Sequence, residues 1–478
     1  MKRISLLMTL ILGVITFTDT LSQGKVSKNK KAIISSLEAH KDRLIEISDN
    51  IWEAAEPALL EFKSSKYLSD YAEENGFRVT RGVAEIPTAF VAEFGSGKPV
   101  IGILGEFDAN PGISQKKQPT KDPLVKGAAG HGCGHNLYGT GSLGAAIAIK
   151  EMIESGEISG TVRFYGTPAE ETIFAKVWMV RAGLFDDVDV CMDWHPSDEV
   201  EAATQSSKAL VDFRLRFYGD ASHASGDPWN GNSAVDAMEL YTTGLNYYRE
   251  HVRPTARIHY DIEKAGDVVN VVPDFAQIWT RLRENDKENV NILYERAKKM
   301  AEAASMMANV DYEMELISGI YEIMPNRFGA GIIQENIESL GEIQYTEDEI
   351  NYANTILKET GKELKGIDSK IRPIRPTLPA QGGSTDVGDV SQVVPVVRMR
   401  ATAAAKDGPW HSWAVVACTG MSIGHKGMIY ASKALAMTML DLYKNPKLID
   451  GVKKEFIERI GDRVYVPQIP PGPPKLVD

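Results

Sequence analysis

The chain carries two imidazoles and a thiol in one short loop, Gly130-His131-Gly132-Cys133-Gly134-His135. Glycine at alternate positions opens backbone conformations that other residues avoid, so the loop can bend sharply and turn neighbouring side chains toward one point. Thiolate and imidazole are ligands that zinc and related first-row ions prefer, and Cys133 and His135 can bind the same ion. The loop therefore predicts a metal site; the alternative is a buried turn whose side chains only pack.

Further potential ligands stand at the ends of three predicted strands around this loop. Asp108 follows one apolar run, the pair Glu170 and Glu171 follows the next, and His195 follows a third. These runs alternate with segments of helical spacing, a βαβ pattern that implies a largely parallel sheet. Sites in open α/β sheets are built at the carboxyl ends of the strands, so we expect these side chains to meet there.

The domain organisation follows from a change in pattern near residue 206. At 478 residues the chain is too long for one ordinary core. After residue 206 the order becomes strand-helix-strand-strand-helix-strand, which is a split βαβ, ferredoxin-like α+β unit. The sequence thus predicts an α/β catalytic domain interrupted by a small lid or dimerisation domain, followed by an extended proline-rich arm. The predicted ranges are 30–205 and 323–447 for the catalytic domain, 206–322 for the lid and 448–478 for the arm.

The N-terminus has the pattern of a secretory signal. Met1-Lys2-Arg3 precedes an apolar run to about Phe17 and then a polar segment. The run is shorter than the ~20 apolar residues that a spanning helix needs. We expect a signal peptide over residues 1–24, an exported and periplasmic mature protein, and no membrane span after cleavage. An uncleaved anchor is the alternative, because no clear cleavage box is present.

Composition narrows the partners. The net charge is -12 and no long basic run is present, so nucleic acid is not an expected partner. Three cysteines cannot form a disulfide framework without a leftover, which agrees with a ligand role for one of them.

Six motifs, in this order and spacing, resemble those of the two-metal aminoacylase and peptidase family. The family includes aminoacylases, hippurate hydrolase and plant hydrolases of indole-acetyl amino-acid conjugates, and the similarity is strongest to its p-aminobenzoyl-glutamate hydrolase branch. The match runs from about residue 35 to 445. The motifs are Gly130 to His135, Pro168-Ala169-Glu170-Glu171, His195, Gly219-Asp220-Ala221-Ser222-His223, Val269-Asn270-Val271-Val272-Pro273 and His411.

The resemblance implies a di-zinc exopeptidase type of fold, a homodimer formed through the lid, and two divalent ions per chain, zinc or manganese, with cobalt as a further option. It also implies a role for each matching residue. The metal ligands would be Cys133, His135, Glu171, His195 and His411; Glu170 would be the general base; His223 would stabilise the oxyanion in a neighbouring subunit's site; and Asn270 and Arg283 would bind substrate.

The chemistry of amide hydrolysis asks for the same groups. A metal-activated water needs a carboxylate that is not itself a ligand to take its proton, and adjacent Glu170 and Glu171 can divide these tasks because neighbouring side chains at a strand exit point in different directions. A donor such as His223 would face the charge of the tetrahedral intermediate. The sequence thus predicts a metal-dependent amidohydrolase of N-acyl amino acids, with an aromatic acyl group such as p-aminobenzoyl favoured. The alternatives are an exported metallodipeptidase and a non-catalytic partner subunit.

Several single assignments stay open at this level. Arg281 is an equal candidate to Arg283, and His425 competes with His411 for the last ligand position. His131 is expected to support the loop, and Asp108 to orient a ligating histidine. The family commonly has Arg-Ala-Asp where this chain has Gly105-Glu106-Phe107, and Ser-Glu-Asp where it has Ser384-Thr385-Asp386, which indicates a divergent substrate pocket.

Overall fold

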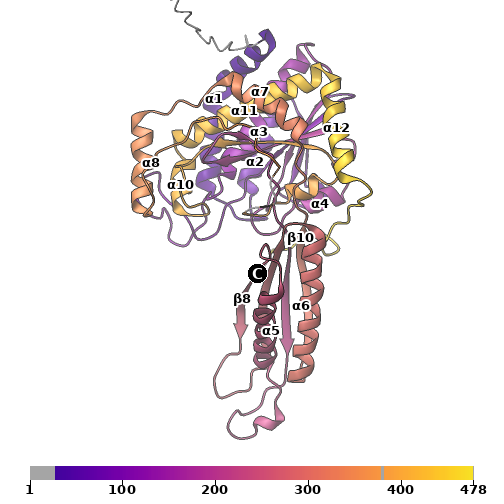
Figure 1. Cartoon of the computed structure of the whole chain (residues 1–478). Coiled ribbons are helices and arrows are strands. Elements are labelled where there is room, and N and C mark those ends of the chain that lie inside the picture. Colours follow the sequence, from indigo (N-terminus) through magenta and orange to yellow (C-terminus); the bar gives the residue numbers. More distant parts are fainter. Residues whose placement is uncertain (1–26, 378–379, 381, 477–478) are drawn as a thin grey trace, which may run out of the picture.

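The computed structural model describes residues 27–377, 380 and 382–476. It consists of a broad body, which holds both the N-terminal and the C-terminal helices, and an elongated second part that projects from the body (Figure 1). The predicted signal peptide, residues 1–24, lies outside the described residues.

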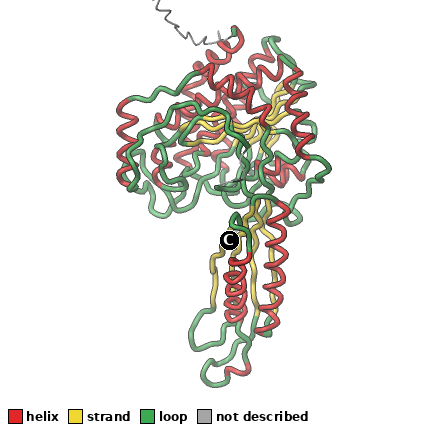
Figure 2. The backbone as a smooth tube through the Cα atoms, viewed as in Figure 1, coloured by secondary structure: helices red, strands yellow, loops and turns green. Residues whose placement is uncertain are grey.

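The body is built on a seven-stranded sheet in the order β1-β2-β4-β3-β5-β11-β6. The four neighbouring strands β4, β3, β5 and β11 are mutually parallel, which confirms the predicted largely parallel sheet. Helices cover both faces (Figure 2), so a strand such as β3, VIGILG, can be apolar throughout and entirely buried. The strands are β1 Arg78–Arg81, β2 Phe90–Gly95, β3 Val100–Gly105, β4 Thr161–Gly166, β5 Val190–Ser197, β6 Glu201–Ala202 and β11 Val396–Thr402.

Three long helices, α1, α3 and α11, pack against one another beside this sheet. The small residues of α3 permit a close approach, since a Cβ at Gly139 would lie 2.6 Å from the carbonyl oxygen of Glu106 on the strand exit. The helices of the body are α1 Lys28–Ala54, α2 Phe62–Glu74, α3 His135–Glu154, α4 Lys176–Arg181, α7 Arg327–Leu340, α8 Glu347–Glu359, α9 Val387–Val390, α10 Trp413–Thr419, α11 Ser422–Lys444 and α12 Pro446–Ile460, with a 3₁₀ turn at Val83–Glu85.

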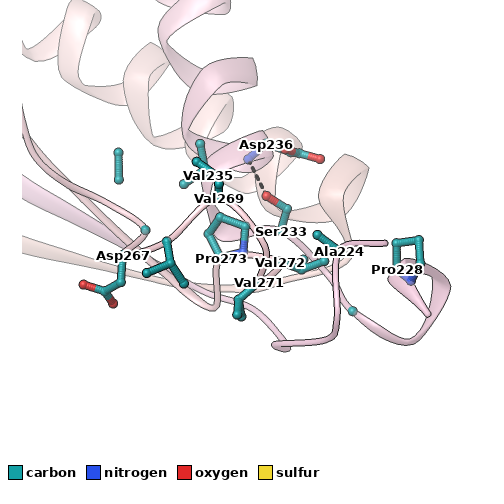
Figure 3. Close-up of a pocket in the computed structure, with 14 residues that line it drawn as sticks. Ala224, Pro228, Ser233, Val235, Asp236, Asp267, Val269, Val271, Val272 and Pro273 are labelled. Carbon is teal, nitrogen blue, oxygen red and sulfur yellow. Dashed lines mark hydrogen bonds between the residues drawn. The ribbon is translucent and has the colours of Figure 1, made fainter. Parts of the chain in front are cut away.

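The second part, called the lid below, is a four-stranded antiparallel sheet in the order β10-β7-β9-β8 with α5 and α6 against one face. Burial alternates along β9, so one face carries the lid's own core while the other is polar. At the lid tip, loops after β7 and before β9 enclose an open pocket lined by Ala224, Pro228 and several valines (Figure 3). The elements are β7 Ala209–Tyr218, α5 Ala234–Tyr248, β8 Arg257–Ala265, β9 Phe275–Glu284, α6 Lys287–Ala308 and β10 Asp311–Ile320, with 3₁₀ turns at Pro228–Asn230 and Arg249–His251.

The C-terminal segment differs from the extended arm predicted from residue 448. Helix α12 occupies its first part, because Pro446 fits the first helical turn and the apolar side chains of Ile449 and Val452 recur at helical spacing and are buried. Only the proline-rich remainder is extended. It packs where the body and the lid meet: the Trp178 side chain donates a hydrogen bond of 2.9 Å to the carbonyl of Gly472, and Gln468 forms a β-bridge with Gly319 of β10.

Hydropathy along the described helices was compared with the requirement for crossing a bilayer. Within the described ranges, none of the helices is both long and apolar enough to do so.

Candidate metal centre

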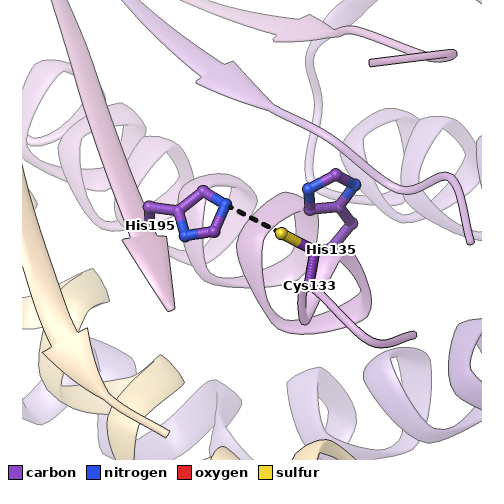
Figure 4. Close-up of side chains that lie close together, drawn as sticks. All are labelled: Cys133, His135 and His195. Carbon is purple, nitrogen blue, oxygen red and sulfur yellow. Dashed lines mark hydrogen bonds between the residues drawn. The ribbon is translucent and has the colours of Figure 1, made fainter. Parts of the chain in front are cut away.

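The first group of potential ligands lies where β5 ends and α3 begins. Cys133 directly precedes α3, His135 is its first residue, and His195 is on β5. Their ligand atoms all lie within 4.8 Å of one another, and the Cys133 Sγ is 3.4 Å from the His195 Nε2 (Figure 4). A thiol and two imidazoles held this closely can share one ion.

A second group shares Cys133 with the first. Cys133, Glu171 and His411 also have ligand atoms within 4.8 Å of one another. The Glu171 carboxylate stands between the two groups, 3.9 Å from the His135 Nε2 through one oxygen and 3.7 Å from the His411 Nε2 through the other. The structure thus brings together the five predicted ligands, Cys133, His135, Glu171, His195 and His411, at the predicted edge of the sheet.

Asp108 lies where a residue that orients a ligand would lie. Its Oδ1 is 2.9 Å from the Nδ1 of His135, and its Oδ2 accepts a 2.9 Å hydrogen bond from the backbone N–H of Glu171. The carboxylate thereby leaves the Nε2 of His135 to face the cluster, and it fixes the backbone at Glu171.

The backbone around the cluster is strained. Ala169, Phe174 and His411 have φ values of 60°, 67° and 52°, in the left-handed region that side chains with a Cβ usually avoid. The backbone N–H of His411 donates to the carbonyl of Gly132, 3.1 Å away, which ties its loop to the Gly-rich loop. Strain of this kind persists only where the surroundings hold it, and it gathers at functional sites.

Burial sets the protonation of these groups. It lowers the pKa of His195 to about 3, so that this imidazole is neutral and able to ligate. Burial and the nearby Glu171 carboxylate raise the pKa of the Cys133 thiol, and burial also raises the pKa of Glu171. A cation among them would reverse both shifts, because it favours thiolate and carboxylate over their protonated forms.

Glu170 is buried beside the ligands. Burial, then the carboxylates of Glu106 and Glu171, raises its pKa well above the usual range. Among the described residues, none donates a hydrogen bond to its carboxylate, which is therefore free to exchange a proton with a reactant.

The two competing histidines point elsewhere. The Nε2 of His131 lies 3.1 Å from the carbonyl oxygen of Ile51 on α1, away from both groups, and the Nε2 of His425 lies 3.1 Å from the Oδ1 of Asp49. Both contacts hold the Gly-rich loop and α11 against α1.

The two predicted lid-tip residues do not join the cluster in the same chain. His223 and Asn270 are exposed on adjoining loops at the end of the lid that lies farthest from the body (Figure 1). The loops are joined by a β-bridge between His223 and Val271 and by a 3.0 Å hydrogen bond from the Ala224 N–H to the Asn270 carbonyl.

The two arginines on β9 lie on the polar face of the lid, near the body. The Arg281 guanidinium pairs with Asp212 and stands 5.6 Å from the ring centre of Phe174, on the loop after Glu171. The Nε of Arg283 has no hydrogen-bond partner among the described residues, and burial with the Arg281 charge lowers its pKa to about 10.

Sequence reasoning missed two buried groups at the site. Lys176 is fully buried and pairs with Glu106 at 2.6 Å and Asp386 at 2.7 Å. A single lysine within the apolar run around α4 was the available signal. Glu61 is fully buried and accepts hydrogen bonds from the Thr88 hydroxyl and the Ala169 N–H; its sequence context gave no signal.

A parallel-sheet domain with clustered thiol, imidazole and carboxylate groups at its strand ends, interrupted by a lid, is typical of a metal-dependent hydrolase. The model of a family described as Peptidase family M20/M25/M40 matches residues 102–413. The chain belongs to this family, and it is a hydrolase that acts on amide bonds.

Two relatives span nearly the whole chain. One of the two subunits of the p-aminobenzoyl-glutamate hydrolase of Escherichia coli (strain K12) is 36% identical over 467 residues, which cover 92% of this chain and 97% of that protein. The Xaa-Arg dipeptidase of Mus musculus is 29% identical over 451 residues, covering 91% and 94%. The crystal structure of a dinuclear metal binding peptidase of the M20 family from Bacillus subtilis has the same fold, with a TM-score of 0.57, 18% identity, and 85% and 99% of the two chains covered.

Proposed function

We propose that this protein is a two-metal amidohydrolase that cleaves N-acyl amino acids of the p-aminobenzoyl-glutamate type. The observation that carries the proposal is the pair of ligand groups sharing Cys133, with the unligated carboxylate of Glu170 beside them. The name of the bacterial relative supports the substrate class.

The donor set fits divalent first-row ions. Thiol, imidazole and carboxylate are the ligands such ions prefer, and two buried ligand atoms, the Nε2 of His135 and the Oε1 of Glu171, have no hydrogen-bond partner among the described residues. Cys133, His135 and His195 would hold one ion, and Cys133, Glu171 and His411 the other. When bound, the ions would supply Lewis-acid chemistry, which can lower the pKa of a water molecule to about 7.

Glu170 would move the proton. Its carboxylate would take a proton from the attacking water and deliver it to the nitrogen of the leaving amine as the amide C–N bond breaks. Its buried position keeps bulk water from competing for that proton.

His223 and Asn270 would act on the site of a second copy of this chain. The Nδ1 of His223 accepts hydrogen bonds from the N–H groups of Ser225, at 3.2 Å, and Gly226, at 3.1 Å. The neutral ring therefore carries its proton on the Nε2, as an oxyanion donor requires. Exposed Val268 and Val269 beside these loops support a lid tip that docks against another subunit in a homodimer.

Arg283 would bind the carboxylate of the amino-acid half of the substrate. A guanidinium group that is largely buried and has an unpartnered Nε favours an anionic ligand, which would restore the missing hydrogen bond. Arg281 already pairs with Asp212, so it is the weaker candidate.

The test combines elemental analysis with hydrolysis. We expect about two ions per chain, and cleavage of p-aminobenzoyl-glutamate that a chelator abolishes and zinc or manganese restores. A purified, folded protein that binds no metal after reconstitution would refute the proposal. Cell fractionation tests the further proposal that the mature protein is exported.

A dipeptidase is the second candidate, because a mammalian Xaa-Arg dipeptidase matches over 91% of this chain. Dipeptides and their N-acylated forms should be compared at equal concentration. Preference for a free amino terminus would favour the dipeptidase. If neither class is cleaved by the metal-loaded protein alone, a different partner subunit is required, since the bacterial relative is itself named as one subunit of its hydrolase.

A further inference from the structure

Glu106, at the end of β3, has a carboxylate with two distinct surroundings. The residue is 1% exposed. Its Oε1 accepts a 2.6 Å hydrogen bond from the Lys176 ammonium, whereas its Oε2 lies 3.0 Å from the Nε2 of His135. One oxygen is thus held by a cation, and the other faces the metal-binding nitrogen of a candidate ligand.

The short contact between Glu106 and His135 is not a hydrogen bond. Both atoms, the Oε2 and the Nε2, lack a hydrogen-bond partner among the described residues, since the direction of approach is wrong although the distance is short. Two buried, unpartnered atoms that converge in this way are costly unless something else satisfies both. Two ligands bound to one zinc ion at about 2.0–2.1 Å lie roughly 3.0–3.3 Å apart for angles between a right angle and the tetrahedral angle. The observed separation has this value.

Lys176 and Asp386 hold Glu106 in this orientation. The Lys176 ammonium is fully buried between Glu106 and the Oδ1 of Asp386, 2.7 Å away, and its own backbone N–H donates to the Oδ2 of Asp386, 2.9 Å away. The lysine therefore fixes one oxygen of Glu106 and leaves the other directed at His135. Ligand atoms of Glu106, His135 and Glu170 lie within 4.8 Å of one another, so a common ion is within reach.

We propose that Glu106 is a further ligand, through its Oε2, of the divalent ion held by His135, and that Lys176 orients it for this purpose. The inference rests on the proposed function, which supplies the ion. It adds a carboxylate to a set that the Gly-rich loop and its neighbours would otherwise provide.

The test is metal affinity of the full chain with Glu106→Gln, and the matched control is Glu61→Gln. Both changes replace a fully buried carboxylate near the cluster by an amide of the same shape, but Glu61 contacts Thr88 and Ala169 and none of the proposed ligands. We expect Glu106→Gln to weaken zinc binding at one of the two sites at least about tenfold, and Glu61→Gln to leave both affinities unchanged.

Two readouts separate a ligand from a structural residue. Loss of a ligand reduces the stabilisation that zinc gives to the folded chain, whereas a structural defect lowers the melting temperature equally with chelator and with zinc. The visible absorption of the cobalt-loaded protein should also change in Glu106→Gln, because its intensity depends on the coordination number. Equal affinity and an unchanged cobalt spectrum would overturn the inference and leave the proposed function standing. A wild-type chain that binds no metal would overturn the proposed function, and the inference with it.

Discussion

The edge of the large sheet and the tip of the lid hold the two halves of the proposed machinery in opposite conditions. At the sheet edge the candidate groups are mostly buried, and their positions are fixed by Asp108 and Lys176. At the lid tip, His223 and Asn270 are exposed on loops that meet only each other. The sheet edge can therefore be organised within one chain, whereas the lid tip needs a second surface to become part of a site.

The comparison is sharpened most by Glu170→Gln at the sheet edge. The amide keeps the shape of the side chain but cannot take a proton, so we expect kcat to fall about a thousandfold with metal content unchanged. Steady-state kinetics and elemental analysis measure the two quantities. Loss of metal together with activity would show that Glu170 is a ligand instead.

The second prediction concerns the cost of burying carboxylates near this edge. Burial, then the Asp108 charge, raises the pKa of Glu61 from 4.5 to about 8. Between these values the unfolded chain is ionised while the folded chain keeps the proton, so the folded state loses stability as the pH rises from 4.5 to 8. We expect Glu61→Gln to remove this loss, on the order of 3 kcal/mol at pH 7.

Urea unfolding of the metal-free chain across this pH range measures the effect. The exposed Glu53, replaced in the same way, serves as the control. Parallel stability curves for wild type and Glu61→Gln would contradict the prediction.

At the lid tip, His223→Ala should lower kcat about a hundredfold by removing an oxyanion donor. If His223 acts in a neighbouring subunit, mixing His223→Ala with Glu170→Gln and allowing the dimers to exchange should restore about a quarter of the sites, because each mixed dimer holds one intact site. Recovery of activity on mixing supports the assignment in trans. Absence of recovery, with exchange confirmed by mass, would place His223 outside catalysis.

The smallest effect is expected from the polar face of the lid. Arg283→Gln should raise KM about tenfold with little change in kcat, because it removes a charged hydrogen bond to the substrate carboxylate. Arg281→Gln is the matched control: it loses the pair with Asp212 and should change stability more than KM. The reverse pattern would assign the carboxylate to Arg281.

The sequence was sufficient for the groups whose signal is local. Strand ends marked by Glu171 and His195, and the Gly-rich loop with Cys133, are recognisable because β-periodicity and ligand spacing are both short-range properties. Lys176 and Glu61 were missed because their burial depends on segments more than 60 residues away: Lys176 meets Glu106 and Asp386, and Glu61 meets Ala169. Distant partners of this kind leave no mark in local composition.

The C-terminal segment was misread for a related reason. Its prolines begin only after α12, and the apolar spacing of Ile449 and Val452 was the better guide. Composition averaged over 448–478 concealed a helix that ends before the proline-rich remainder begins.

The place of β11 has a consequence for how the protein is made. This strand lies between β5 and β6, and its Arg398 pairs with Asp193, 205 residues earlier in the chain. At typical translation rates the ribosome needs about 10 to 40 seconds to cover that distance, and it completes the whole lid in between. Throughout that time one edge of β5 is open, apolar and able to pair with another nascent chain. We expect expression yield to depend on chaperones and growth temperature more than on the stability of the finished fold.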